Sequence, residues 1–129
     1  MRLRRFGMAL VSAAGATALA TCPAFAAGST YQLGSGNHVA SGGLTWLNRS
    51  VTVQGSVGDI GGAGTQVEFD AYANTTVVDY QTRSAVNETT PYNFTIDGSQ
   101  WPGGITKVFV ILWDVHTGEP IDHATLVRS

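Results

Sequence analysis

Residues 65–82, which read TQVEFDAYANTTVVDYQT, decide the fold of this chain of 129 residues. Apolar and polar side chains alternate on both sides of Asn74 and Thr75, and a period of two residues is typical of a strand with one buried face. A two-residue turn at these positions places Phe69 opposite Tyr80. The sequence therefore predicts a β-hairpin whose strands cover residues 65–73 and 76–82.

The same register brings two carboxylates together in this hairpin. Asp70 lies opposite Asp79, and like charges that face each other directly destabilise a sheet. A bound calcium ion would compensate the repulsion. We favour a shifted register, or an outward splay of both side chains, over a calcium site.

Short stretches rich in Val, Ile, Thr and aromatic residues continue along the chain, separated by Gly, Asn, Asp or Pro. No window shows a sustained helical period. About seven short strands at this spacing are typical of an immunoglobulin-like sandwich, so we predict an all-β fold of two small antiparallel sheets. The other strands are expected at residues 44–48, 50–57, 92–96, 105–116 and 121–128. Residues 27–43 are rich in Gly and Ser and form either a flexible arm or a weak first strand.

A second hairpin is expected around a turn at residues 117–120. This turn pairs His116 with Ile121 and Trp113 with Ala124. The alternation then gives one apolar face, which we assign to the core, made of Phe109, Ile111, Trp113, Val115, Ala124 and Leu126.

Residues 1–26 resemble a secretory signal peptide. Three arginines among the first five residues precede an apolar run of about 15 residues and the triplet Ala24-Phe25-Ala26, the order of regions found in export signals. The apolar run is shorter than the roughly 20 residues that a membrane-spanning helix needs. We therefore expect a bacterial leader that is cleaved after Ala26, and a secreted single domain of residues 27–129 without a membrane span.

The charge and the cysteine content of this domain exclude two classes of function. Residues 27–129 contain four basic and nine acidic side chains, a net charge of −5, and no cysteine. Because no patch of Lys and Arg exists to neutralise phosphates, we do not expect binding to nucleic acid. A disulfide framework and cysteine chemistry are excluded as well.

The densest polar segment, residues 113–123, offers a candidate metal site. In the predicted hairpin Asp114 lies opposite His123, and His116 projects from the same face, so two imidazoles and a carboxylate converge as ligands suitable for zinc. The alternative is an Asp-His pair at an exposed hairpin tip. We favour that alternative and predict no cofactor, because a hairpin end is usually convex and a catalytic site needs a pocket.

Three aromatic residues are candidates for ligand binding. Trp101 lies in a turn followed by Pro and two Gly, and Trp46 and Tyr72 are expected to face outward. An exposed ring can stack on a sugar or anchor a protein interface. The alternative for Trp101 is a ring folded over one end of the core.

Four asparagines match the pattern of N-glycosylation acceptors: Asn48, Asn74, Asn87 and Asn93. Because the leader is of a bacterial kind, we favour a by-product of Thr-rich strands and asparagine-containing turns over modification.

No group of residues in the sequence makes a strong case for a catalytic site. We therefore favour a secreted, non-catalytic binding protein that uses loops at one end of the sandwich. One form of it is an inhibitor of an extracellular hydrolase, for which a rigid exposed loop is required, and residues 58–64 and 99–104 are the candidates. The alternative is a module that binds carbohydrate or the cell envelope through exposed aromatic rings. A metal-dependent enzyme built on Asp114, His116 and His123 is the third hypothesis.

Overall fold

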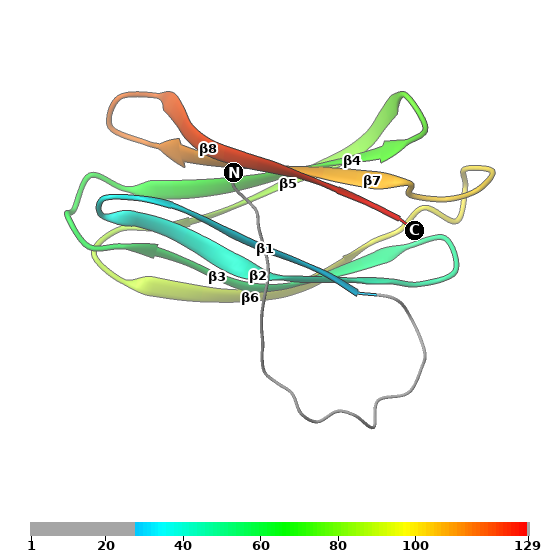
Figure 1. The fold of residues 1–129 in the computed structure, drawn as a ribbon, viewed down its shortest axis with the longest axis horizontal. Helices are drawn as coiled ribbons and strands as arrows, with labels where there is room; N and C mark the ends of the chain where they lie inside the picture. The colour runs from blue at the N-terminus through cyan, green and yellow to red at the C-terminus, as the bar shows by residue number, and fades with distance from the viewer. Residues whose placement is uncertain (1–27, 129) are drawn as a thin grey trace, which may run out of the picture.

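The computed structural model describes residues 28–128 (Figure 1). The predicted signal peptide and its cleavage point lie outside these residues. Eight strands follow one another along the chain: β1 (Gly28–Ser35), β2 (His38–Trp46), β3 (Val51–Asp59), β4 (Thr65–Ala73), β5 (Thr76–Ala85), β6 (Thr89–Ile96), β7 (Lys107–Asp114) and β8 (Glu119–Val127).

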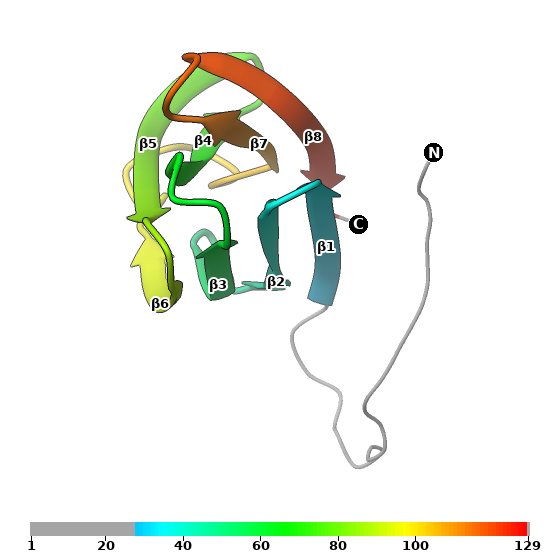
Figure 2. The ribbon, with the colours of Figure 1, turned by 90° about the vertical axis from the view of Figure 1, so that its left-hand side faces the viewer.

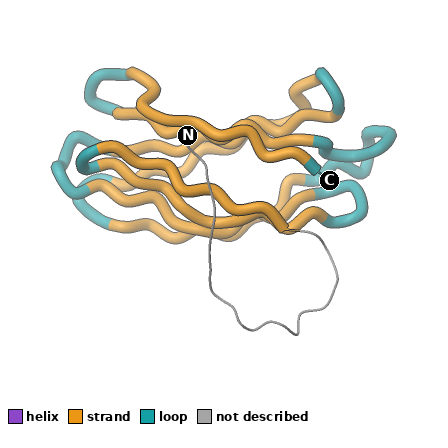
Figure 3. Tube along the Cα trace, viewed as in Figure 1, coloured by secondary structure: helices purple, strands orange, loops and turns teal. Residues whose placement is uncertain are grey.

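The strands form two antiparallel sheets of four, in the orders β1-β2-β3-β6 and β5-β4-β7-β8. The sheets lie face to face as two layers, and β8 curves over to lie beside β1 (Figure 2). The chain crosses between the layers after β3, β5 and β6, and such crossings are typical of immunoglobulin-like sandwiches. Loops join the strands at both ends (Figure 3). The predicted all-β sandwich of two sheets is confirmed, with eight strands instead of about seven.

The additional strand comes from residues 27–43, where the weak-strand alternative is confirmed. β1 pairs with β2 along its whole length, and its inward side chains Tyr31 and Leu33 are buried. Gly36 forms the tight turn between the two strands with φ 62°, a backbone conformation that glycine adopts without a steric cost. The described part of the chain contains no helix that is long and apolar enough to cross a membrane.

A row of two tyrosines and two glycines lies at the centre of the core. Tyr31 pairs with Gly42, Gly42 with Gly55, and Gly55 with Tyr92 across the first sheet. The two glycines leave room for both phenol rings, whose hydroxyl oxygens lie 2.5 Å apart. Phe69 of the second sheet packs edge-on against both rings, with centroid distances of 5.9 and 5.5 Å. These contacts hold the two sheets in register at the middle of the sandwich.

The β4–β5 hairpin has the predicted two-residue turn, with Asn74 at φ 60°. A β-bulge between Ala71 and Tyr72 then shifts the register, so that Asp70 lies opposite Tyr80. The predicted pairs of Phe69 with Tyr80 and of Asp70 with Asp79 are therefore wrong. The alternative of a shifted register is confirmed, since the bulge separates the two carboxylates.

The β7–β8 hairpin turns two residues earlier than predicted. Asp114 pairs with Glu119, and a second bulge lies between Leu112 and Trp113, so that His123 pairs with Ile111. The predicted pairs of His116 with Ile121, of Trp113 with Ala124 and of Asp114 with His123 are wrong.

The prediction of which face of β7 belongs to the core is also wrong. The fully buried side chains of β7 are Val108, Val110 and Leu112. Phe109, Ile111 and Trp113 alternate with them and therefore point away from the core. The sequence could not decide between the two faces because residues 108–113 are apolar throughout.

Candidate functional site

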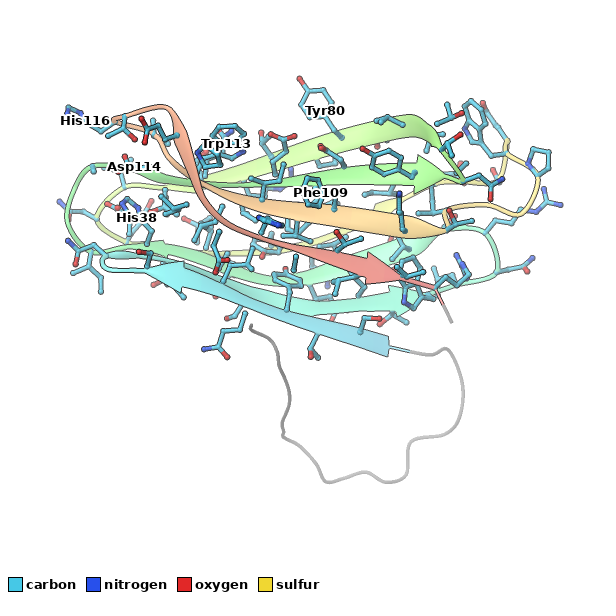
Figure 4. The ribbon with its side chains drawn as sticks, turned by 45° about the horizontal axis from the view of Figure 1, so that its top comes forward. His38, Tyr80, Phe109, Trp113, Asp114 and His116 are labelled. Atoms are coloured by element: carbon cyan, nitrogen blue, oxygen red, sulfur yellow. The ribbon has the colours of Figure 1, made fainter. Side chains whose placement is uncertain are left out.

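A buried polar network closes the core at the end of the sandwich that lies on the left of Figure 1. Asp59 and Thr65 stand at the end of β3 and the start of β4, and His38 starts β2. The Thr65 hydroxyl donates to Asp59 Oδ1 at 3.1 Å, so it accepts from His38 Nδ1, which lies 2.6 Å away. His38 Nε2 lies 3.4 Å from Asp114 Oδ2. Figure 4 shows His38 and Asp114 facing each other from opposite sheets.

Asp59 holds the two loops beside it. Its Oδ2 accepts hydrogen bonds from the amides of Asn87, at 2.8 Å, and Gly62, at 2.9 Å. The amide of Asn87, the hydroxyl of Thr65 and the amide of Gly62 keep the pKa of Asp59 below its usual range, although burial acts in the opposite direction. The β3–β4 loop is rich in glycine, but its backbone is tied to a buried carboxylate.

Asp114 holds a third loop in the same way. Its Oδ1 accepts hydrogen bonds from the amides of His116, at 2.9 Å, and Thr117, at 3.3 Å. The amide of Val115 donates to the carbonyl of Gly64 at 3.0 Å, which joins the β7–β8 turn to the β3–β4 loop. The polar network therefore fixes three loops, at residues 59–64, 86–88 and 115–118, as one surface that we call the Ile60 end.

Each of these three loops presents an exposed aliphatic side chain. The exposed fractions are 74% for Ile60, 57% for Val86 and 51% for Val115. Burying apolar area of this kind contributes about 25 cal/mol per Å². Exposed aliphatic side chains on loops that are held rigidly are candidates for contact with another protein.

Acid should loosen this end of the molecule. In the unfolded chain Asp59 returns to its ordinary pKa of 3.8, so its contribution to stability is present above that pH and lost as the pH falls through the lower, folded-state pKa. We expect the urea midpoint of the wild-type domain to fall as the pH is lowered below about 4. Asp59→Asn should have a lower midpoint at neutral pH and a flatter dependence on acid.

Asp97 offers the matched comparison for this experiment. Hydrogen bonds from Ser99 also keep its pKa below the ordinary value, but it lies at the opposite end of the sandwich. Asp97→Asn should leave proteolysis of the β3–β4 loop unchanged, whereas Asp59→Asn should accelerate it. Equal acid dependence of Asp59→Asn and the wild type would contradict the role assigned to Asp59.

The three residues that were considered as an alternative metal site do not converge. His116 lies at the exposed tip of the β7–β8 turn (Figure 4), and His123 packs its ring edge-on against Phe109 at 5.5 Å. Only Asp114 joins the buried network. Among residues 28–128 no group of three or more His, Cys, Asp or Glu side chains is arranged to hold a metal ion.

The three aromatic residues predicted to bind ligand have different surroundings. Trp46 is 4% exposed and its indole nitrogen donates to the Ser29 hydroxyl at 3.0 Å, so the expectation of an outward ring is wrong. Tyr72 does lie on the outer side of β4, where the Lys107 ammonium covers its ring at 4.6 Å from the centroid. Trp101 is 37% exposed in the loop between β6 and β7.

The Trp101 loop is held rigidly at the end opposite to Ile60. The amide of Trp101 donates to the Gly98 carbonyl at 3.0 Å, and the amide of Ile105 donates to the Arg49 carbonyl at 2.8 Å. The Arg49 guanidinium also donates to the Ser99 carbonyl at 3.0 Å. Both loops that were considered for insertion into a partner are therefore anchored to the body of the sandwich.

The four candidate acceptor asparagines are all exposed. Asn74 and Asn87 have φ of 60° and 56°, and asparagine is among the few non-glycine residues that adopt this conformation readily. Turn geometry therefore accounts for asparagine at two of the four positions.

Sequence reasoning missed His38 and Asp59. His38 lies in the Gly- and Ser-rich segment of residues 27–43, and Asp59 lies in the glycine-rich segment of residues 58–64. Asp59 is the first acidic residue of the chain, and its place at the end of an apolar strand is the only signal that points to it.

Comparison of the chain with models of protein families, with curated proteins and with solved structures finds no match.

Proposed function

We propose that this chain is an exported binding protein whose Ile60 end docks into an apolar cleft of an extracellular protein. The observation that carries the proposal is the presence of three exposed aliphatic side chains on three loops that a buried polar network fixes together. A preorganised surface loses little conformational entropy when it binds. Residues 1–26 serve as the export signal in this proposal.

The polar network supports binding more than catalysis. Asp59 accepts three hydrogen bonds from neighbouring groups, and the side chain of His38 is only 12% exposed, between Asp59 and Asp114. These groups are engaged with one another instead of facing a substrate. Their effect is to position the loops, which is the role expected in an inhibitor or another non-catalytic binder.

The Ile60 end fits a protein partner better than the Trp101 end does. Its exposed aliphatic residues come from three separate loops, whereas the opposite end offers Trp101 at 37% and Leu47 at 40% exposure. Ile60 is the most exposed of the three aliphatic side chains, at 74%. We therefore place the docking centre at Ile60.

The test is a pull-down of tagged residues 27–129 from the culture fluid and envelope fraction of the producing cells. Ile60→Asp should weaken the binding of a stoichiometric partner by at least about 30-fold, the effect of losing one hot-spot residue. Trp101→Ala is the matched control at the other end and should retain the partner. Hydrolase activity of the eluted partner, measured with and without excess domain, tests inhibition directly.

The same pull-down can contradict the proposal. A partner that is lost with Trp101→Ala and retained with Ile60→Asp would place docking at the opposite end. Equal recovery with the wild type and both variants would remove the loops from binding altogether.

A further inference from the structure

The outer faces of the two sheets differ sharply in chemistry. On β1-β2-β3-β6, Thr, Ser, Gln and Asn occupy most of the outward positions. On β5-β4-β7-β8, the outward positions include Tyr80, Phe109, Ile111 and Trp113, together with Glu68 and Asp70. Figure 4 shows Tyr80 projecting from this second face on β5, with Phe109 and Trp113 on β7, which lies on the other side of β4. We call these six residues the aromatic face.

Apolar and hydrogen-bonding groups form parallel strips on the aromatic face. β4 contributes Glu68 and Asp70, and β7 lies directly beside it. Asp70 is paired with Tyr80 on one side and with Phe109 on the other. The span from Phe109 to Trp113 covers about 13 Å along the strand, so the strip is long enough for an extended ligand.

The two carboxyl groups have no cationic partner among the described residues. No salt bridge joins Glu68 or Asp70 to a basic side chain there, and the nearby Lys107 lies over the Tyr72 ring. Glu68 instead accepts a hydrogen bond from the Trp113 indole nitrogen at 3.1 Å. Burial and the neighbouring Glu68 raise the pKa of Asp70 to about 7, so near neutral pH the protonated fraction of Asp70 can donate a hydrogen bond and its ionised fraction can accept one.

We propose that the aromatic face binds a neutral polysaccharide chain. The rings stack against the apolar C–H faces of the sugars, and Glu68 and Asp70 hydrogen-bond to hydroxyl groups along the edge of the chain. This inference does not depend on the Ile60 end, because it concerns a different surface and a different class of ligand.

The charge of the face argues against other occupants. An anionic polymer or a nucleic acid would meet two carboxyl groups without a basic residue between them. A second copy of this chain, packed face to face around a two-fold axis, would bring two such carboxyl pairs together in a buried interface, which is costly. A neutral chain rich in hydroxyl groups meets neither obstacle.

The test measures depletion of purified residues 27–129 from solution by insoluble cellulose and chitin, with an insoluble calcium polygalacturonate gel as the anionic comparison. We expect retention on cellulose or chitin and none on polygalacturonate. Tyr80→Ala/Trp113→Ala should weaken the retention about tenfold or more, because it removes two stacking rings. Tyr80→Ala alone, at a side chain that is 64% exposed, should give a smaller loss without a change in Tm.

Two control variants make the result specific to this face. Gln54→Ala, on the outer side of the first sheet, and Ile60→Asp should both bind polysaccharide like the wild type. The inference is overturned by absence of retention on both cellulose and chitin, by undiminished retention of the Tyr80→Ala/Trp113→Ala variant, or by preferential binding to polygalacturonate. Because Ile60→Asp should weaken binding of the protein partner and leave polysaccharide binding unchanged, either proposal can fail without the other.

Discussion

Gly55→Ala is expected to lower the free energy of unfolding by about 3 kcal/mol or more, the upper part of the range for an overpacked core. A methyl group on Gly55 would overlap the carbonyl oxygen of Ser41 and would lie 2.8 Å from the Cα of Gly42. Both obstacles are backbone atoms, so neither can move aside without separating β2 from β3. The same separation would pull apart the tyrosine row that spans the first sheet.

Urea unfolding of the two proteins, followed by circular dichroism, measures this effect. For a domain of this size the loss corresponds to a Tm decrease of at least about 12 °C. Gly28→Ala is the matched control, because its methyl group would lie 3.5 Å from the nearest atom, the Leu44 carbonyl oxygen, which is an ordinary contact. A Gly55→Ala protein as stable as Gly28→Ala would show that β2 and β3 approach each other less closely than described.

The second large effect is a loss of stability in alkali. Burial raises the pKa of Tyr92 to about 12, and burial together with Tyr92 raises the pKa of Tyr31 further still. In the unfolded chain both phenols titrate near the ordinary value of 10.0. Above that pH the unfolded state therefore binds fewer protons than the folded state, and stability falls as the pH rises.

The expected slope is about 1.4 kcal/mol per pH unit for each tyrosine, or about 2.7 kcal/mol for both together. Below pH 10 the contribution of the pair is fully present. Urea midpoints measured between about pH 8 and pH 12 should show this decline. The variant Tyr31→Phe/Tyr92→Phe removes both buried hydroxyls at once, so it leaves neither one without a partner and should abolish most of the decline.

A surface pair provides the control for this substitution. Tyr72→Phe/Tyr80→Phe removes the same number of hydroxyls from the outer side of the second sheet and should keep the dependence of the wild type. If the core variant and the wild type lost stability in parallel above pH 10, the tyrosine row would not be the cause.

The sequence was most informative where one face of a strand is polar. The alternation along β4 is strict, and its predicted bounds at residues 65–73 agree with the structure. On β7 every residue from 108 to 113 is apolar, so periodicity could not show which face is buried. The bulge at Leu112 and Trp113, which depends on packing between the sheets, could not be read from local composition.

The candidate functional surfaces were harder to predict from the sequence than the fold was. His38 and Asp59 are 21 positions apart in the numbering of the chain and meet only because β2 pairs with β3 from end to end. That pairing involves residues 38–43, which the sequence analysis assigned either to a flexible arm or to a weak strand. Long-range pairing of this kind is set by tertiary packing, which local propensity does not encode.

Both ends of the described chain lie on the same side of the sandwich as Trp101. Gly28 pairs with Thr45 at the end of β2, and the Arg128 guanidinium donates to the carbonyl oxygens of Leu47, Ser50 and Ile105. A tag, a linker or a fused domain attached at either terminus therefore leaves from the side remote from Ile60. Immobilised in this way, the domain presents its aliphatic loops to the surrounding medium, with the aromatic face running along its flank, which suits it for display on a solid support.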